Sequence, residues 1–311
     1  MSHRNEYFCI QIAKMKRSLL LNILFLLIGF NGYAQDSGIS YKPTHKIYSS
    51  NGKEVGYFKM LESLKSADII LFGELHNSSI IHWLQLQTTL DLLKDTAVSL
   101  KMGAEMYSTN QQNDIDEYLS GITNDKGFEK NTKQWNNYKT DYKPLMKLAK
   151  EKGISFIACN SPKELSTIVF RKGIDSLNLI KDDSILSLIA PLPLKVDYNA
   201  PGYKELMETD FGSSHKMDTK LLVEAQALKD ATMAHSILNN IILDGIFLHF
   251  NGDFHSKDRG GIVHWLNYYS AKKLDISTIS SVESSSLDFN KGWKKQGDFI
   301  IVILDKGLKS Y

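Results

Sequence analysis

Hydrophobic and polar positions alternate along this chain in blocks that are typical of strands followed by helices. Short apolar runs bounded by polar or turn residues predict buried strands at residues 68–72, 97–104, 154–159, 245–250, 276–281 and 299–304. Apolar residues at helical spacing predict helices at residues 77–93, 144–151, 218–243 and 262–270. This alternation predicts an α/β fold with a mostly parallel sheet flanked by helices, in three layers.

Two long segments do not follow the alternation. Residues 108–142 are polar and aromatic, and residues 163–215 contain three prolines and short helical patterns. Both begin after predicted strands, where long insertions commonly carry binding surfaces. We therefore expect one α/β domain over residues 35–311, with helical insertions that form a lid or a pocket wall.

The first 34 residues have the pattern of a secretory signal peptide. Lys14, Lys16 and Arg17 precede an apolar run over residues 19–30, and the small residue Ala34 follows shortly after it. That run is shorter than the ~18 residues that a membrane-spanning helix needs, and no cysteine follows it as a lipobox would require. We expect cleavage near Ala34 and an exported protein, periplasmic or at the cell surface.

Composition narrows the function classes further. The 311 residues include 37 Lys and Arg against 35 Asp and Glu, a net charge of +2, and this balance excludes a protein that holds nucleic acid through a basic face. Cys159 is the only cysteine after the predicted leader, so an oxidising compartment would form no internal disulfide. We also expect Cys159, within a predicted strand, to be buried and inert.

Polar side chains follow four of the predicted strands. Glu74 and His76 lie in a GELH sequence, Glu105 follows the second strand, Asn160 the third, and His255 comes shortly after the fourth. Because the carboxyl ends of parallel strands share one edge, we expect these groups to converge there. Two carboxylates and two imidazoles suit a divalent-metal site, a general acid–base pair or a polar cradle for a cofactor. Spacing alone does not choose among these.

A further polar pair lies on the long helix predicted at residues 218–243. Gln226 and Asp230 share a face with apolar residues, and a buried carboxylate needs a partner. Either these side chains fasten the helix to the core or they support the pocket. Arg259, just after His255, is the expected partner for Asp230 or for an anionic ligand.

The other histidines are weaker site candidates. His82 could face the crevice and His215 could close over it, although a structural role is the simpler interpretation of each. We expect packing or surface roles for His235, His249 and His264. The sequence contains no HExxH, GxSxG, P-loop or GxGxxG motif, which argues against the corresponding zinc-protease, serine-hydrolase, nucleotide and dinucleotide sites.

A set of motifs runs in order from about residue 68 to residue 266. It comprises GELH at 73–76, His82, GAEMY at 103–107, Gln111, Tyr118, Trp135, Tyr142 with Pro144, Asn160 with Pro162, Gln226 with Asp230, Met233 with Ala234, and Gly252 with His255, Arg259 and Gly261. Together these motifs resemble the ChaN-like haem-binding uptake family, which belongs to the wider Tiki and erythromycin-esterase-like group.

The resemblance implies an exported haem-binding protein of haem or iron uptake. It also implies dimers that hold haem between subunits, an outer-membrane uptake system as partner, and attachment of the iron through a tyrosine, a known type of haem ligand. The haem-binding candidates are Tyr107, Tyr118, Tyr138, Tyr142, His82, His215 and Arg259, with Asn160, Gln226 and Asp230 as pocket support.

The related enzymes imply an alternative function. By their resemblance, Glu74, His76, Glu105 and His255 would bind a divalent metal or activate water, as in a Tiki-like peptidase or an esterase-like hydrolase. His76 and His255 would be ligands, one carboxylate would complete the ligand set, and the other would act as base. At the level of sequence, haem binding and metal-dependent hydrolysis both remain open.

Overall fold

The computed structural model describes residues 42–209, 218–307 and 309–311. The predicted signal peptide, its cleavage site near Ala34 and the candidate His215 lie outside the described residues. Residues Thr44–Tyr311 form one unit, and no helix among the described residues is both long and apolar enough to cross a membrane.

A seven-stranded sheet forms the centre of this unit. Its spatial order is β1-β7-β6-β2-β5-β3-β4. The strands are β1 (His45–Ser49), β2 (Ile69–Glu74), β3 (Ser99–Ser108), β4 (Phe156–Asn160), β5 (Gly245–Gly252), β6 (Ile276–Ser284) and β7 (Phe299–Leu304). All neighbouring strands are parallel except β1, which pairs antiparallel with β7. The mostly parallel sheet predicted from the alternation is confirmed.

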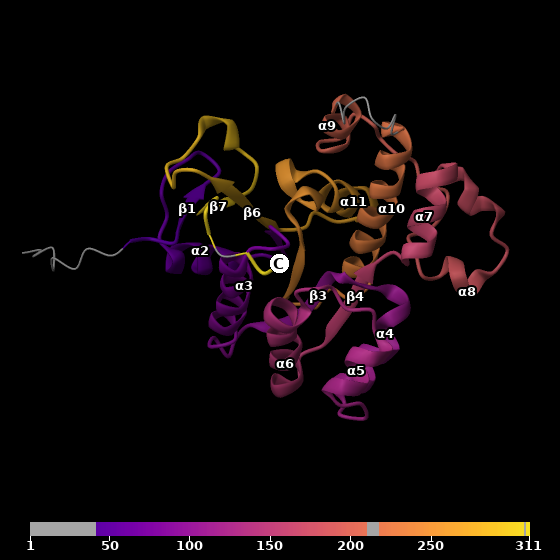
Figure 1. Cartoon of the computed structure of the whole chain (residues 1–311), viewed down its shortest axis with the longest axis horizontal. Helices are drawn as coiled ribbons and strands as arrows, with labels where there is room; N and C mark the ends of the chain where they lie inside the picture. Colours follow the sequence, from indigo (N-terminus) through magenta and orange to yellow (C-terminus); the bar gives the residue numbers. More distant parts are fainter. Residues whose placement is uncertain (1–41, 210–217, 308) are drawn as a thin grey trace, which may run out of the picture. The chain divides into compact units, whose positions relative to one another are not determined.

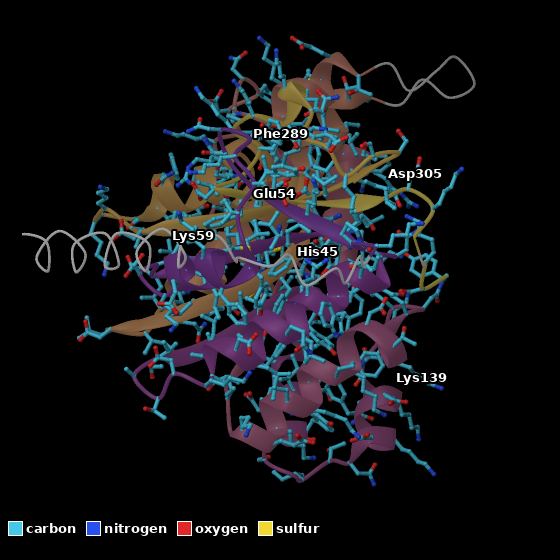
Figure 2. All side chains as sticks on the ribbon, turned by 90° about the vertical axis from the view of Figure 1, so that its left-hand side faces the viewer. His45, Glu54, Lys59, Lys139, Phe289 and Asp305 are labelled. Carbon is cyan, nitrogen blue, oxygen red and sulfur yellow. The ribbon has the colours of Figure 1, made fainter. Side chains whose placement is uncertain are left out.

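The edge strand β1 was not predicted, because residues 35–50 have a polar pattern. Five residues are too few to show a period of two, and only Ile47 and Tyr48 of this strand are buried. Figure 2 views the side of the molecule that carries β1, with His45 and Phe289 labelled; the Phe289 ring packs 5.2 Å from that of Tyr48. An antiparallel edge strand of this kind is common on parallel sheets.

Helices cover both faces of the sheet, as predicted. In β2, Ile70 and Phe72 pack into one hydrophobic cluster, whereas Ile69 and Leu71 pack into the other, because successive side chains point to opposite faces. The first face is covered by α2 (Tyr57–Leu64), α3 (Ser79–Leu92) and α6 (Lys143–Lys152), and the second by α7 (Lys163–Lys172), α10 (Thr219–Leu238) and α11 (Ile262–Tyr269). Figure 1 shows α3 and α6 on one side of the strands and α10 and α11 on the other.

Both insertions contain short helices. The first holds η1 (Thr109–Gln111), α4 (Gln112–Leu119), α5 (Asp125–Asn131) and the π-helical η2 (Tyr138–Tyr142). The second holds α7, η3 (Ile174–Leu179), α8 (Asp183–Leu186) and α9 (Tyr203–Glu208). The turns η4 (Asp253–His255) and η5 (Lys257–Arg259) follow β5, and η6 (Lys291–Trp293) precedes β7.

Candidate functional site

The polar strand ends predicted from the sequence lie at one edge of the sheet. Strands β2, β5, β3 and β4 are neighbours in that order, and Glu74 at the end of β2 is in register with Gly252 at the end of β5. Strand β3 continues four residues beyond its predicted end, so Glu105 lies within the strand, next to an irregularity in its pairing with β4. The acids and imidazoles form two clusters here.

The first, called the β2 cluster, contains Glu74, His76, His82, Gln85 and Tyr142. Glu74 accepts hydrogen bonds from His76 Nδ1 at 2.9 Å, from the Tyr142 hydroxyl at 2.5 Å and from Gln85 Nε2 at 2.7 Å. The ring nitrogens of His82 lie 3.0 Å from the Gln85 side-chain oxygen and 3.0 Å from the His76 carbonyl oxygen. The Glu74 side chain is only 3% exposed, whereas that of His76 is 42% exposed.

The first insertion holds this cluster in place. Asn137 Nδ2 donates to the His76 carbonyl at 2.7 Å and to Asp141 at 2.6 Å. The Trp135 ring meets that of His76 edge to face, with ring centroids 5.0 Å apart, and that of Tyr142 at 5.5 Å. The polar and aromatic pattern of residues 108–142 therefore belongs partly to the site and partly to the core.

Charge in the β2 cluster favours an ionised carboxylate. Burial alone would raise the pKa of Glu74, but the hydrogen bond from His76 and the nearby His82 outweigh it and lower that pKa. For His76, burial would lower the pKa, but the carboxylates of Glu74 and Glu105 raise it. The ionised Glu74 and the imidazole of His76 therefore stabilise each other's charged forms, and the imidazole is the more exposed of the two.

The second, called the β3 cluster, contains Glu105, Asp230, His255, Tyr203 and Trp265. His255 Nε2 contacts Glu105 at 3.1 Å, and its Nδ1 is hydrogen-bonded to Asp230. Asp230 also accepts from the Tyr203 hydroxyl at 2.7 Å, and this hydroxyl accepts from the Trp265 indole at 2.9 Å. Glu105 accepts from the backbone N–H of Gly252 at 2.7 Å. Every titratable side chain in this cluster is nearly inaccessible.

The two carboxylates keep His255 charged. Burial would lower the pKa of His255, but Glu105 and Asp230 raise it to about 10. Burial would raise the pKa of Glu105, but the imidazolium of His255 lowers it strongly. Burial keeps the pKa of Asp230 raised despite the same imidazolium. His255 is therefore a buried cation between two acids.

The prediction that Arg259 pairs with Asp230 is wrong. His255 occupies Asp230 instead, and Arg259 forms an ion pair with Asp298 at 3.0 Å. The chain turns sharply after His255, with Arg259 in the left-handed region at φ 56°. This turn directs the guanidinium toward the segment before β7, so sequence proximity to His255 did not translate into spatial proximity to Asp230.

The arrangement does not support the divalent-metal site of the alternative function. Within the described residues, no group of three or more His, Cys, Asp and Glu side chains is placed to hold a metal ion. The four side chains expected to share one ion are divided between the clusters, and both ring nitrogens of His255 are occupied by carboxylates. These acids and imidazoles pair with each other rather than face a common point.

The candidate tyrosines are all buried. Tyr142 belongs to the β2 cluster, whereas Tyr107, Tyr118 and Tyr138 pack around Phe128 in the core. Tyr118 donates to Asp125, and the Tyr107 hydroxyl has no hydrogen-bond partner among the described residues. Ligation of iron by any of these tyrosines stays a prediction.

A cavity of about 710 Å³ opens beside the β3 cluster. Its walls include Glu105, Asn160 and Gln226, together with apolar side chains and three lysines that the sequence analysis did not single out. The Asn160 amide donates to the Glu105 carbonyl at 3.0 Å, and the Gln226 amide lies 3.0 Å from His255 Nδ1. The additional wall residues include Met106, Trp135, Phe170, Leu222, Lys133, Lys163 and Lys229.

Two sequence signals could have identified two of these three lysines. Lys163 begins α7 directly after the strand end at Asn160, and Lys229 lies one helical turn after Gln226.

The remaining predictions concern burial. Cys159 and His249 are fully buried, as expected, and burial raises the pKa of the Cys159 thiol.

A family model agrees with this arrangement of motifs. The model described as haem-binding uptake, Tiki superfamily, ChaN matches residues 60–266. The chain belongs to this family. The matched segment extends from α2 to α11 and includes both polar clusters and most of the cavity wall.

Several solved structures are similar to this chain at low sequence identity, and one of them shares the fold. The structure of cofacial heme binding to ChaN of Campylobacter jejuni superposes with a TM-score of 0.60 at 17% identity, and the match covers 83% of this chain and 96% of that one. A mutant of the erythromycin esterase EreC in its open conformation has a TM-score of 0.45 at 11% identity, and the match covers 76% of this chain and 77% of that one. A Bacillus cereus protein has a TM-score of 0.46 at 11% identity, and the match covers 79% of this chain and 91% of that one. No curated protein matches the chain significantly.

Proposed function

We propose that this protein binds haem and takes part in haem or iron uptake, with the ligand held at the carboxyl ends of the strands. The observation that carries the proposal is the family match over residues 60–266, which contains the cavity beside Glu105. A haem-binding member of the family needs an apolar surface for the porphyrin and polar groups that fix its orientation.

The cavity meets both requirements. Its volume of about 710 Å³ lies in the usual range for cofactor and small-molecule sites. Trp135, Phe170 and Leu222 offer apolar surface to a porphyrin ring. Haem carries propionate carboxylates, which lysines bind as charge partners.

Three lysines and three carboxylates, those of Glu105, Asp114 and Glu164, line this cavity. Lys133 and Lys163 are exposed, and Lys229 is half-buried. None of them forms an ion pair in the part of the chain that the structure describes. These lysines are therefore available to bind the propionates of haem, although the carboxylates in the same wall leave no excess of positive charge there.

The proposal extends to cellular context. The leader pattern of residues 1–34 supports export after cleavage near Ala34. The family resemblance supports a homodimer that holds haem between subunits and delivery from an outer-membrane uptake system. Each of these is a separate proposal, tested by the N-terminal sequence of the secreted protein, by its mass in solution with and without haem, and by co-purification.

Titration with haemin tests the binding proposal. We expect a saturable shift of the Soret band at a defined stoichiometry. Replacing both Lys163 and Lys229 with Glu should raise the Kd at least about tenfold, which corresponds to ~1.4 kcal/mol. Lys139, exposed on η2 and labelled in Figure 2, is the matched control because it does not line the cavity. Weak, non-saturating binding by the wild type would contradict the proposal.

A further inference from the structure

We propose that the indole of Trp135 is the surface against which the porphyrin ring of haem stacks, and that His76 and Tyr142 of the β2 cluster hold this indole in position. The inference rests on the proposed haem binding and deepens it, because it gives the β2 cluster a role in a cavity that His76 and Tyr142 do not line. It leaves the iron with a tyrosine, as the family resemblance implies, since ring stacking does not involve the iron.

Trp135 belongs to both parts of the site. Its side chain is half-buried and lines the cavity beside Glu105. Its ring also meets the rings of His76 and Tyr142, with centroid distances of 5.0 Å and 5.5 Å. Neither of these two rings lines the cavity. The indole is therefore the contact through which the β2 cluster acts on the cavity.

The described part of the cavity wall contains two aromatic rings, those of Trp135 and Phe170. Phe170 lies on α7 and is 38% exposed. The Trp135 ring is instead fixed by two nearly perpendicular ring contacts, at interplanar angles of 88° and 89°, a geometry that aromatic pairs prefer because positive ring edges meet negative ring faces. A ring that is fixed before the ligand arrives loses little conformational freedom on binding. Trp135 is thus the preorganised stacking surface of this wall.

The backbone around Trp135 does not fix the indole by itself. Residues 133–135 lie in neither a helix nor a strand, between α5 and η2. The Tyr138 N–H donates to the Trp135 carbonyl at 3.0 Å, and Asn137 Nδ2 donates to the His76 carbonyl at 2.7 Å. The second of these hydrogen bonds ties the segment to the end of β2, so the position of the indole depends on the β2 cluster.

His76 is a rigid support because several of its ring atoms are held. Nδ1 is hydrogen-bonded to the buried Glu74 carboxylate at 2.9 Å. A Cβ atom at Gly252 would lie 2.7 Å from Cε1 and 2.8 Å from Nε2, so this edge of the ring packs against the backbone at the end of β5. The imidazole cannot turn away from Trp135 without losing the hydrogen bond to Glu74 or moving into that backbone.

Tyr142 is held by the same carboxylate. Its hydroxyl donates to Glu74 at 2.5 Å, and its ring meets that of His82 with the centroids 4.8 Å apart. Glu74 also accepts from Gln85 Nε2 at 2.7 Å. One buried carboxylate therefore fixes both of the rings that contact Trp135. Glu74, His76 and Tyr142 are positioning residues of the cavity.

Metal-free protoporphyrin IX tests the assignment, because it keeps the flat ring and the propionates of haem but has no iron. We expect haemin and metal-free protoporphyrin both to bind to the wild type and to quench the fluorescence of Trp135, identified as the emission that is lost in Trp135→Phe. In absorption titrations Trp135→Ala should raise both Kd values at least about tenfold. Trp83→Phe is the matched control, because Trp83 is 53% exposed and does not line the cavity.

The positioning residues are tested with the same two ligands. His76→Ala and Tyr142→Leu should each raise both Kd values about threefold to tenfold, because the indole is no longer preorganised. Gly252→Ala should resemble His76→Ala, because its Cβ would displace the imidazole. Tyr142→Phe keeps a ring against Trp135, and its Kd for metal-free protoporphyrin should stay within about twofold of the wild-type value. Circular dichroism checks that each variant is folded.

The outcomes distinguish this inference from the proposed function. Equal factors for the two ligands in His76→Ala would support a positioning role. A loss confined to haemin would place the effect at the iron and overturn the inference, and so would unchanged Kd values in a folded Trp135→Ala or His76→Ala variant. A wild type that binds haemin but no metal-free protoporphyrin would overturn the inference and leave haem binding intact. A wild type that binds neither ligand would overturn the proposed function as well.

Discussion

The β2 and β3 clusters contain the same kinds of side chain and use them differently. Each places an imidazole against a carboxylate near the carboxyl end of a parallel strand. In the β3 cluster His255 is 6% exposed and lies between two acids, whereas in the β2 cluster His76 is 42% exposed and contacts one. Similar composition therefore produces a closed structural unit and an open site.

The difference arises from what covers each imidazole. Helix α10 brings Asp230 to His255, and Tyr203 and Trp265 close the network behind it. His76 is followed by a short loop before α3, and its ring packs against the Trp135 ring and the backbone of Gly252. A buried charge is costly unless it is paired on all sides, so we expect the β3 cluster to contribute more to stability than the β2 cluster.

The largest expected effect is that of Asp230→Ala. Removing this carboxylate leaves a buried imidazolium with one of its two charge partners and frees the Tyr203 hydroxyl. Loss of one partner of a buried ion pair costs about 3–5 kcal/mol. Chemical denaturation of the variant and the wild type measures this loss of unfolding free energy. Glu62→Ala, which removes the 68% exposed partner of Lys65, should change the unfolding free energy by less than about 1 kcal/mol. An equal loss of unfolding free energy in Asp230→Ala and Glu62→Ala would contradict the stabilising role of the β3 cluster.

The next effect is a dependence of stability on pH. The pKa of His255 is raised from 6.5 to about 10 in the folded protein, so its stabilising contribution is complete below pH 6.5 and is lost as pH rises toward 10. We expect the unfolding free energy to fall by a few kcal/mol across this window. Glu105→Gln should shift the end of the window to lower pH, because it removes one of the two carboxylates that raise this pKa. A wild type whose stability is flat from pH 6.5 to 10 would contradict the ion pairing.

A smaller loss is expected for Glu74→Gln. The new amide group turns one acceptor into a donor, so one of the hydrogen bonds from His76, Tyr142 or Gln85 is lost. A hydrogen bond to a charged group contributes about 1.5–3 kcal/mol. A double-mutant cycle with Tyr142→Phe should show coupling between the two sites, because they are in direct contact. Additive effects would mean that the 2.5 Å contact does not stabilise the fold.

The smallest effect on stability is expected for His76→Ala. The ring is partly exposed, and its removal leaves Glu74 with hydrogen bonds from Tyr142 and Gln85. We expect a loss in unfolding free energy of about 1.5 kcal/mol, the lower end of the range for a hydrogen bond to a charged group, because water can reach the position of the exposed ring. A loss as large as that of Asp230→Ala would place His76 in the structural framework and remove the contrast between the clusters.

Much of the fold could be predicted because the strands of a parallel sheet are buried on both faces and appear as short apolar runs. All six predicted strands are present. Strand β3 extends past its predicted end and through Glu105, because the charged residue within GAEMY interrupts the apolar pattern that marks a buried strand. The strand β1 was missed because its pattern is short and only partly buried. Local pattern thus detected strands wherever burial was complete.

Part of the candidate site could be predicted in the same way. Since strand ends share an edge, Glu74, Glu105 and His255 could be expected to gather without knowledge of the strand order. The ion-pair partner of each charged residue could not be predicted. Arg259 was wrongly expected to pair with Asp230, because its true position depends on a left-handed turn after His255. The cavity lysines were also missed, because they lie on separate helices and insertions.

The sequence by itself determined the alternation of strands and helices, the edge at which the acids and imidazoles gather, and the family to which the chain belongs. Hydrophobic burial imposes periods that are visible in a single segment. Only the tertiary structure decided that these polar groups form two clusters and that His255 is enclosed while His76 stays open beside a cavity. Those outcomes depend on contacts among α10, η2 and the ends of β2, β3 and β5, which lie far apart along the chain and which no local pattern encodes.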